Sequence, residues 1–383
     1  MGRLAMGVAA LAVVSSLWVG LCSGATIYIK PDGTGDVPTI AAGLAAAGVG
    51  DTLMLASGTF TGPGNQDLTI PDKNLKIVSE TGNPDDCVID FAGTYGFLFE
   101  NGTAMIKGLT LTNAIWSALR VWTYMSDGYV TLWVRNCTFS NCEGDGAAIN
   151  IACYGEIDIT GCRFLSNTGG QWGAVAIQAL AYLDTWMDAC TFCGNSGEWG
   201  GAISCVALEG PVSVRNSIFC HNLATQGGGA IGLIEWCPEI FACTFFGNSA
   251  PLGSALAGGY WPGVVNCILA YGRGGPAFYV DEACPDCDPG AFCSNIYGNE
   301  GGDWVGLIAD DLGQNGNFSA PPGFCYWETA PYDLHLCSGS PCLPGNHPDE
   351  VDCGLIGALG QGCDCGPTRT APATWGAIKA MYR

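Results

Sequence analysis

The middle of the chain is an internal repeat of roughly 22 to 28 residues, the kind of period that indicates a solenoid. Each copy has a short apolar strand ending in Phe, followed three residues later by Asn. The four clear copies are Phe164 with Asn167, Phe192 with Asn195, Phe219 with Asn222, and Phe245 with Asn248. An imperfect copy at Phe139, with Asn141 one place early, and a last one at Leu269 give spacings of 25, 28, 27, 26 and 24 residues. One coil of this size cannot bury its own apolar face, so the copies must stack.

A second landmark, Gly-small-Ala-aliphatic, trails the first at the same period. It occurs at Gly146–Ile149, Gly200–Ile203, Gly228–Ile231 and Gly253–Leu256. The runs between the landmarks hold three to five residues that alternate apolar and polar, which is too short for helices and typical of strands. A leucine-rich repeat would show Leu at fixed spacing, and this chain does not. The sequence therefore predicts an all-β fold, a single right-handed parallel β-helix.

Stacked coils should place equivalent residues in rows. We expect three parallel sheets from about Lys73 to Leu269, with the repeated Phe residues in one buried row. The repeated Asn residues should form a second row at a corner, where Asn tolerates the left-handed conformation and its amide bonds the next coil. Cys193 and Cys220 each follow a row Phe and lie 27 residues apart, so we predict a disulfide between neighbouring strands, with two stacked thiols as the alternative.

The two ends of the chain differ from the coils. Residues 26–60 read as strand, helix, strand, with Asp36 and Pro38 opening a helix that presents Ile40, Leu44 and Ala47 on one face. That helix would cover the open end of the apolar tube. Residues 301–365 are predicted to be irregular, cysteine-rich final coils held by disulfides. Residues 366–383 read as a linker and a short basic helix.

Residues 1–25 match a secretory signal peptide. Arg3 precedes an apolar run, and Ser23-Gly24-Ala25 supplies small residues for cleavage. The alternatives are an uncleaved membrane anchor and, because of Cys22, a lipoprotein, for which Leu21 is a poor match. No later segment approaches the roughly 20 apolar residues that a membrane span needs. We predict a secreted or cell-surface protein with no membrane span after signal cleavage.

Composition agrees with export. The chain has 22 Cys, which favours disulfides over metal binding in an oxidising compartment. The pairs Cys284 with Cys287 and Cys363 with Cys365 could hold metal, but neither has a partner pair at zinc-finger spacing. A net charge of −22 would repel a phosphate backbone, so nucleic acid is excluded as a partner.

Two stretches resemble known families. The opening Asp32 to Ile40, with Gly50 to Leu55 and Gly58 to Phe60, resembles the start of pectinesterases and other pectin-lyase-like β-helix proteins. Residues 136–280 are similar to the repeats of chlamydial polymorphic outer-membrane proteins and related secreted bacterial β-helix proteins. The proteins with these similar repeats are surface or adhesin-type proteins. The tail 366–383 resembles a short C-terminal tag of secreted bacterial proteins, which implies a sorting role.

Neither resemblance brings an active site with it. Gln178 and Asp90 are the nearest candidates for the pectinesterase motifs, and the rest of those motifs is missing. His221, His335 and His347 are the only histidines, and none lies in the Gly-His-Gly pattern of polygalacturonases. The arginines of the coils match no lyase motif. We therefore assign no catalytic residue.

Four tryptophans are candidates for carbohydrate binding. Trp172 and Trp199 precede equivalent corners 27 residues apart, and Trp236 and Trp261 form a second such pair. Sugar rings pack on flat exposed indoles, whereas the alternative is an aromatic row that only stiffens the turns.

An acidic loop is the candidate for metal binding. It carries Asp281, Glu282, Asp286 and Asp288, whose oxygens suit calcium, although their spacing is not that of an EF-hand. The alternative is a solvated loop closed by a disulfide, and no other cofactor is expected.

Three functions fit these observations. The favoured one is a non-enzymatic β-helix that binds extracellular polysaccharide or mediates surface adhesion. The second is a carbohydrate-active lyase, esterase or hydrolase with a site built from scattered carboxylates. The third is a structural surface-layer component. An enzyme should bring carboxylates, or a carboxylate and an Arg, together in a cleft, whereas a binder should show an open aromatic strip.

Overall fold

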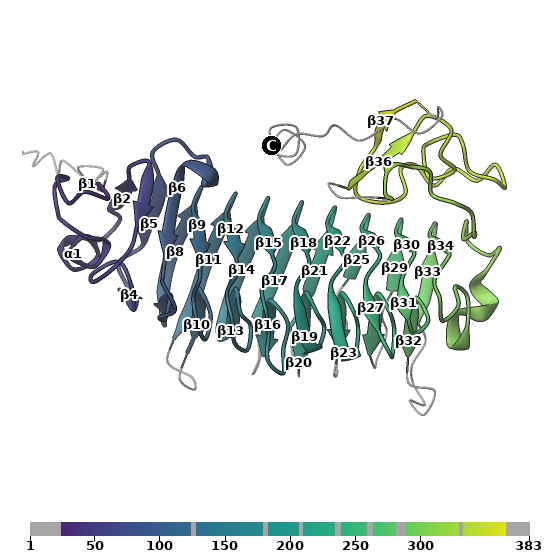
Figure 1. The fold of residues 1–383 in the computed structure, drawn as a ribbon, viewed down its shortest axis with the longest axis horizontal. Helices are drawn as coiled ribbons and strands as arrows, with labels where there is room; N and C mark the ends of the chain where they lie inside the picture. The colour runs from purple at the N-terminus through teal and green to yellow at the C-terminus, as the bar shows by residue number, and fades with distance from the viewer. Residues whose placement is uncertain are drawn as a thin grey trace, which may run out of the picture.

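The computed structural model describes residues 24–123, 128–178, 183–206, 210–233, 239–258, 263–280, 289–328 and 332–364. These form an elongated parallel β-helix whose coils stack along the long axis in Figure 1. Each coil adds one strand to each of three long parallel sheets, as the repeat predicts. The all-β, right-handed parallel fold is confirmed.

The three long sheets are named A, B and C. Sheet A contains β1 (Thr26–Ile29), β2 (Thr52–Leu55), β5 (Leu75–Ser79), β8 (Gly102–Lys107), β11 (Tyr129–Arg135), β14 (Tyr154–Thr160), β17 (Leu183–Asp188), β21 (Val212–Arg215), β25 (Glu239–Phe241), β29 (Gly263–Val265) and β33 (Gly290–Phe292). Sheet B contains β3 (Gly58–Phe60), β6 (Cys87–Asp90), β9 (Thr110–Thr112), β12 (Thr138–Ser140), β15 (Arg163–Leu165), β18 (Thr191–Cys193), β22 (Ile218–Cys220), β26 (Thr244–Phe246), β30 (Ile268–Ala270) and β34 (Asn295–Tyr297). Sheet C contains β4 (Leu68–Ile70), β7 (Phe97–Phe99), β10 (Leu119–Trp122), β13 (Ile149–Ala152), β16 (Val175–Gln178), β20 (Ile203–Val206), β24 (Ile231–Leu233), β28 (Leu256–Gly258) and β32 (Phe278–Val280).

Smaller elements complete the fold. A short sheet D at the corner between B and C contains β19 (Ser196–Trp199), β23 (Leu223–Gly227), β27 (Ser249–Ala250) and β31 (Arg273–Gly274). The remaining elements are α1 (Ile40–Ala46), the 3-10 helices η1 (Pro84–Asp86) and η2 (Gly306–Asp311), and a C-terminal sheet of β35 (Phe324–Tyr326), β36 (Asp333–Cys337) and β37 (Gln361–Cys363).

The predicted Phe row lies in the core of the tube. Phe139, Phe164, Phe192, Phe219 and Phe245 stack ring on ring, with centroid separations of 5.1, 4.5, 4.8 and 4.7 Å. All five are buried. Their spacing matches the distance between neighbouring strands, so one ring per coil fills the core without a gap.

The predicted Asn row is also confirmed, but the left-handed backbone conformation predicted for these Asn residues is wrong. Asn195 is buried, and its Nδ2 donates to Asn222 Oδ1 and to the Phe164 carbonyl, both at 2.9 Å.

The left-handed backbone conformation lies one residue before each Asn, as at Ser166 and His221, because the Asn must turn inward to reach the next coil. For the same reason Cys142, and not Asn141, continues the row, and its N–H donates to Asn167 Oδ1 at 3.1 Å.

Five buried cysteines of the coils belong to a third inward row, together with one serine, and none of the five is in a disulfide. The row includes Cys137, Cys162, Cys190, Ser217, Cys243 and Cys267. The Cys190 N–H donates to Ser217 Oγ at 3.1 Å, and the Cys243 N–H donates to Cys267 Sγ at 3.4 Å. Thiol and hydroxyl therefore both accept a hydrogen bond from the backbone of the preceding coil. The high cysteine count thus reflects core packing more than cross-linking.

Three disulfides lie within the described residues, Cys193–Cys220, Cys293–Cys353 and Cys325–Cys363. The first confirms the predicted bridge between neighbouring strands, with its Cα atoms 4.6 Å apart. Among the described residues, no helix is long and apolar enough to cross a membrane.

Helices cover both ends of the apolar tube. Ile40, Leu44 and Ala47 are buried against the first coils, as predicted for α1. Its N-cap is Thr39, whose hydroxyl accepts from the Ala42 N–H at 3.2 Å, and not Asp36, whose carboxylate accepts from the Tyr28 N–H instead. At the other end η2 packs on the last strands and buries Ile308.

The chain after η2 folds back along the outer side of sheet B. Figure 1 shows β36 and β37 beside the strands of that sheet. Phe324, Leu334 and Leu336 share a buried cluster with Phe246 and Ile268 of sheet B. His221 is part of this contact, since the centroid of its ring lies 4.3 Å from that of Tyr332. Burial is the main cause that lowers the pKa of His221, and the positive charge of Arg273 lowers it further. The boundaries predicted for this region and for the tail stay predictions.

Candidate functional site

The predicted tryptophan platform is only partly within the described residues. Trp172 and Trp199 are direct partners in adjacent coils, at the corner where β19 lies. Both are half-buried, and the Trp199 ring packs over Gly227 of the next coil. Trp236, Trp261 and the predicted calcium ligands Asp281, Glu282, Asp286 and Asp288 lie outside the described residues. Sugar stacking on Trp172 and Trp199 therefore stays a prediction.

A wider aromatic surface lies on the outer face of sheet A. β11 and β14, with seven residues each, are the longest strands of the sheet, and their neighbours β8 and β17 have six each, so the sheet is broadest there. The outward residues on β11, β14 and β17 form what we call the strip. It comprises Tyr129, Thr131, Trp133, Arg135, Tyr154, Glu156, Asp158, Thr160, Asp184, Trp186 and Asp188.

Two indoles and a carboxylate form the central row of the strip. Trp133, Asp158 and Trp186 are register partners on three adjacent strands. The two tryptophans are thus two strand spacings apart, about 9–10 Å. Trp186 is 52% exposed, and Trp133 is half-buried. An open face with flat rings on either side of a hydrogen-bonding group can hold a sugar chain that runs along the helix axis.

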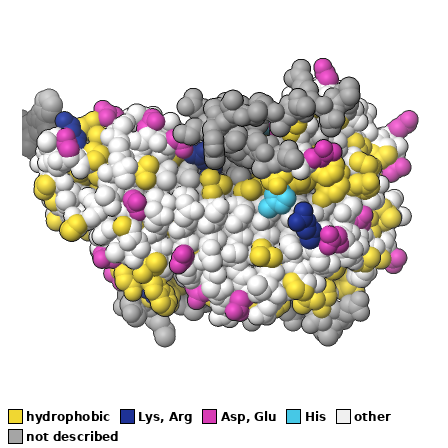
Figure 2. Space-filling model, in the orientation of Figure 1, with side chains coloured by type: hydrophobic (Ala, Val, Ile, Leu, Met, Phe, Trp, Pro, Cys, Tyr) yellow, Lys and Arg dark blue, Asp and Glu magenta, His cyan; other side chains and the backbone are white. Residues whose placement is uncertain are grey.

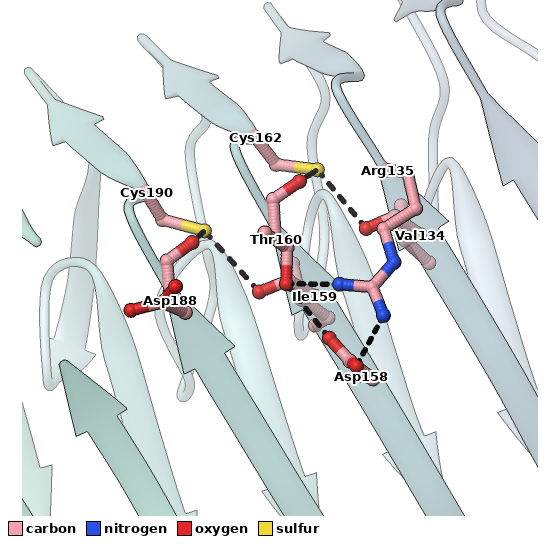
Figure 3. A network of polar contacts seen from close by, with 8 residues as sticks. All are labelled: Val134, Arg135, Asp158, Ile159, Thr160, Cys162, Asp188 and Cys190. Carbon is pink, nitrogen blue, oxygen red and sulfur yellow. Dashed lines mark hydrogen bonds and ion pairs between the residues drawn. The ribbon is translucent and has the colours of Figure 1, made fainter. Parts of the chain in front are cut away.

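A polar network holds the strip in place (Figure 3). The Arg135 guanidinium reaches from β11 to Asp158 and Thr160 of β14, and the Thr160 hydroxyl donates to Asp158 Oδ1 at 2.8 Å. Beneath it, the inward thiols of Cys162 and Cys190 donate to the Val134 and Ile159 carbonyls, each at 3.5 Å. Because Asp158 is tied from two sides, its position between the indoles is fixed before any ligand arrives.

A groove of about 1060 Å³ lies on another side of the molecule, between the outer face of sheet B, residues 81–86 and the C-terminal segment. On one wall Arg163 pairs with Asp85 at 2.5 Å and donates to the Thr138 hydroxyl at 2.9 Å. On another wall His335 Nδ1 lies 2.7 Å from Asp333 Oδ1. The groove thus contains a carboxylate with an Arg and a carboxylate with a His.

Sequence reasoning missed both surfaces, for different reasons. Alternation gave a usable signal for the strip, because inward Val130, Leu132 and Val134 force Trp133 outward, and the same holds for Trp186 between Thr185 and Met187. The groove gave none, since Asp85 and Arg163 are 78 residues apart and the wall with His335 forms only when the C-terminal segment folds back. Within the described residues, no group of three or more His, Cys, Asp or Glu side chains is arranged to hold a metal ion.

Comparison with known proteins identifies the family. A family model described as "Right handed beta helix region" matches residues 85–279, about half of the chain, so the chain belongs to this family. No curated protein matches the sequence. One solved structure, described as the PL6 family alginate lyase AlyGC, aligns with a TM-score of 0.36 and 11% identity. The alignment covers 92% of this chain but 60% of that one, and similarity at this level says nothing of activity.

Proposed function

We propose that this protein is a secreted or cell-surface β-helix that binds extracellular polysaccharide through the strip, without cleaving it. The observation that carries the proposal is the alignment of Trp133 and Trp186 on an open face, with the fixed carboxylate of Asp158 between them. Rings of a sugar chain would stack on the indoles while their hydroxyls bond Asp158. The same open face would allow attachment to a glycan-coated surface.

Export is part of the proposal. It is supported by the signal-like residues 1–25 and by the three disulfides, which persist in oxidising compartments. Figure 2 shows many acidic and few basic side chains on the face turned to the viewer, which suits a protein kept soluble outside the cell.

Replacing Trp186 with Ala tests the strip. We expect binding to the best ligand of a glycan panel to weaken by about tenfold, the scale of one lost ring contact, with a comparable loss for Trp133→Ala. Trp116 is 62% exposed outside the strip, so Trp116→Ala serves as the matched control and should bind like wild type. Equal affinity of all four proteins would show that the strip is not the binding face.

The groove favours a second candidate function, a carbohydrate-active enzyme. The Asp333 carboxylate could orient His335 as a general base next to a space large enough for an oligosaccharide. If this candidate holds, oligosaccharides should be cleaved by wild type and not by His335→Gln or Asp333→Asn. If the oligosaccharides remain intact after long incubation with the wild-type protein, binding is left as the function.

A further inference from the structure

Two carboxylates on the strip face each other, and within the described part of the chain no Lys or Arg side chain pairs with either. Glu156 on β14 and Asp184 on β17 are register partners on adjacent strands, so their Cα atoms are about 4.8 Å apart. Among the described residues neither has an ion-pair partner, and Glu156 accepts only a hydrogen bond, from the Tyr129 hydroxyl at 3.2 Å. Like charges directly opposite each other destabilise a sheet. The fold therefore keeps an arrangement that costs it stability.

The surroundings do not neutralise this pair. Arg135 is engaged by Asp158, and Arg215, on the next strand, is engaged by Glu239 at 2.6 Å. Asp188, further along β17, accepts a hydrogen bond from the Asn216 amide at 2.7 Å. Partial burial, and then the Glu156 and Asp184 carboxylates, raise the pKa of Tyr129, as expected where negative potential accumulates.

We propose that the ligand of the strip is a polysaccharide with protonated amino groups, one of which sits between Glu156 and Asp184 while its rings stack on Trp133 and Trp186. This inference rests on the proposed function and names its substrate class. An ammonium group offers three donors to the two carboxylates, and indole and phenol faces also attract cations. Calcium needs six to eight oxygen ligands, more than two carboxylates and one hydroxyl supply. A polyuronate would be repelled.

The test compares three hexasaccharides of equal length, made of glucosamine, N-acetylglucosamine or galacturonate. They are titrated calorimetrically into the full protein at low salt and mildly acidic pH. We expect the glucosamine hexamer to bind at least about tenfold more tightly than the acetylated one, since its contacts are charge-assisted, and the galacturonate hexamer not to bind. The double variant Glu156→Gln/Asp184→Asn should lose this preference, keep its affinity for the acetylated hexamer, and unfold at a higher temperature than wild type.

A charge-matched control is available in Glu143→Gln/Glu198→Gln, which removes two exposed carboxylates outside the strip. It should keep the wild-type preference, which would exclude an effect of net charge alone. Equal affinity for the two hexosamine hexamers would overturn the amine assignment and leave polysaccharide binding intact. Binding that requires calcium and is abolished by EDTA would overturn it as well. If no hexamer binds, and Trp186→Ala leaves the affinity for the best ligand of the glycan panel unchanged, both the amine assignment and the proposed function are wrong.

Discussion

Phe192→Ala should lower the free energy of unfolding by about 3–5 kcal/mol, the usual range for a buried Phe. Its ring lies between those of Phe164 and Phe219, at centroid distances of 4.5 and 4.8 Å, and removing it opens a cavity that the rigid coils cannot close. Chemical denaturation followed by circular dichroism measures the change. Phe192→Leu is the control, and it should cost less than half as much because it keeps most of the volume. Similar losses for both variants would contradict ring stacking in the core.

Asn195→Ala should cost about 3 kcal/mol or more, because it leaves several buried groups without partners, each worth about 1–3 kcal/mol. Asn195 Oδ1 accepts from the Asn167 backbone N–H at 3.0 Å and from Asn167 Nδ2 at 2.9 Å. Its Nδ2 also donates to the Phe164 carbonyl and to Asn222 Oδ1, so one substitution disrupts three consecutive coils. Denaturation of Asn195→Ala beside Asn346→Ala, which removes a side-chain amide from a C-terminal loop, measures the difference. A loss below 1 kcal/mol would mean that water replaces the row.

The coil architecture could be predicted because it is local and repeated. Residues 24 to 28 positions apart meet in space, so spacing alone placed Phe192 against Phe219 and Cys193 against Cys220. The backbone of the Asn corner could not be read in the same way. Both the Asn and the residue before it are compatible with a left-handed conformation, and only the inward hydrogen bonds decide between them.

The surfaces that could carry function were harder to predict. Trp172 and Trp199 were predicted because they precede the repeated Gly-Ala corner, and the Trp199 ring packs over Gly227 of the next coil. Trp133 and Trp186 are 53 residues apart, which is two coils, so the one-coil repeat period does not pair them. The groove is lined by residues 81–86, sheet B and residues 332–335, a combination of distant segments that no local pattern encodes.

A crystal structure of the protein in complex with its tightest-binding oligosaccharide would show which face holds the ligand. We expect density for sugar rings on the outer face of β11, β14 and β17, stacked on Trp133 and Trp186 and bonded to Asp158. A ligand found instead in the groove beside His335 and Asp333, or along Trp172 and Trp199, would contradict the strip as the binding face.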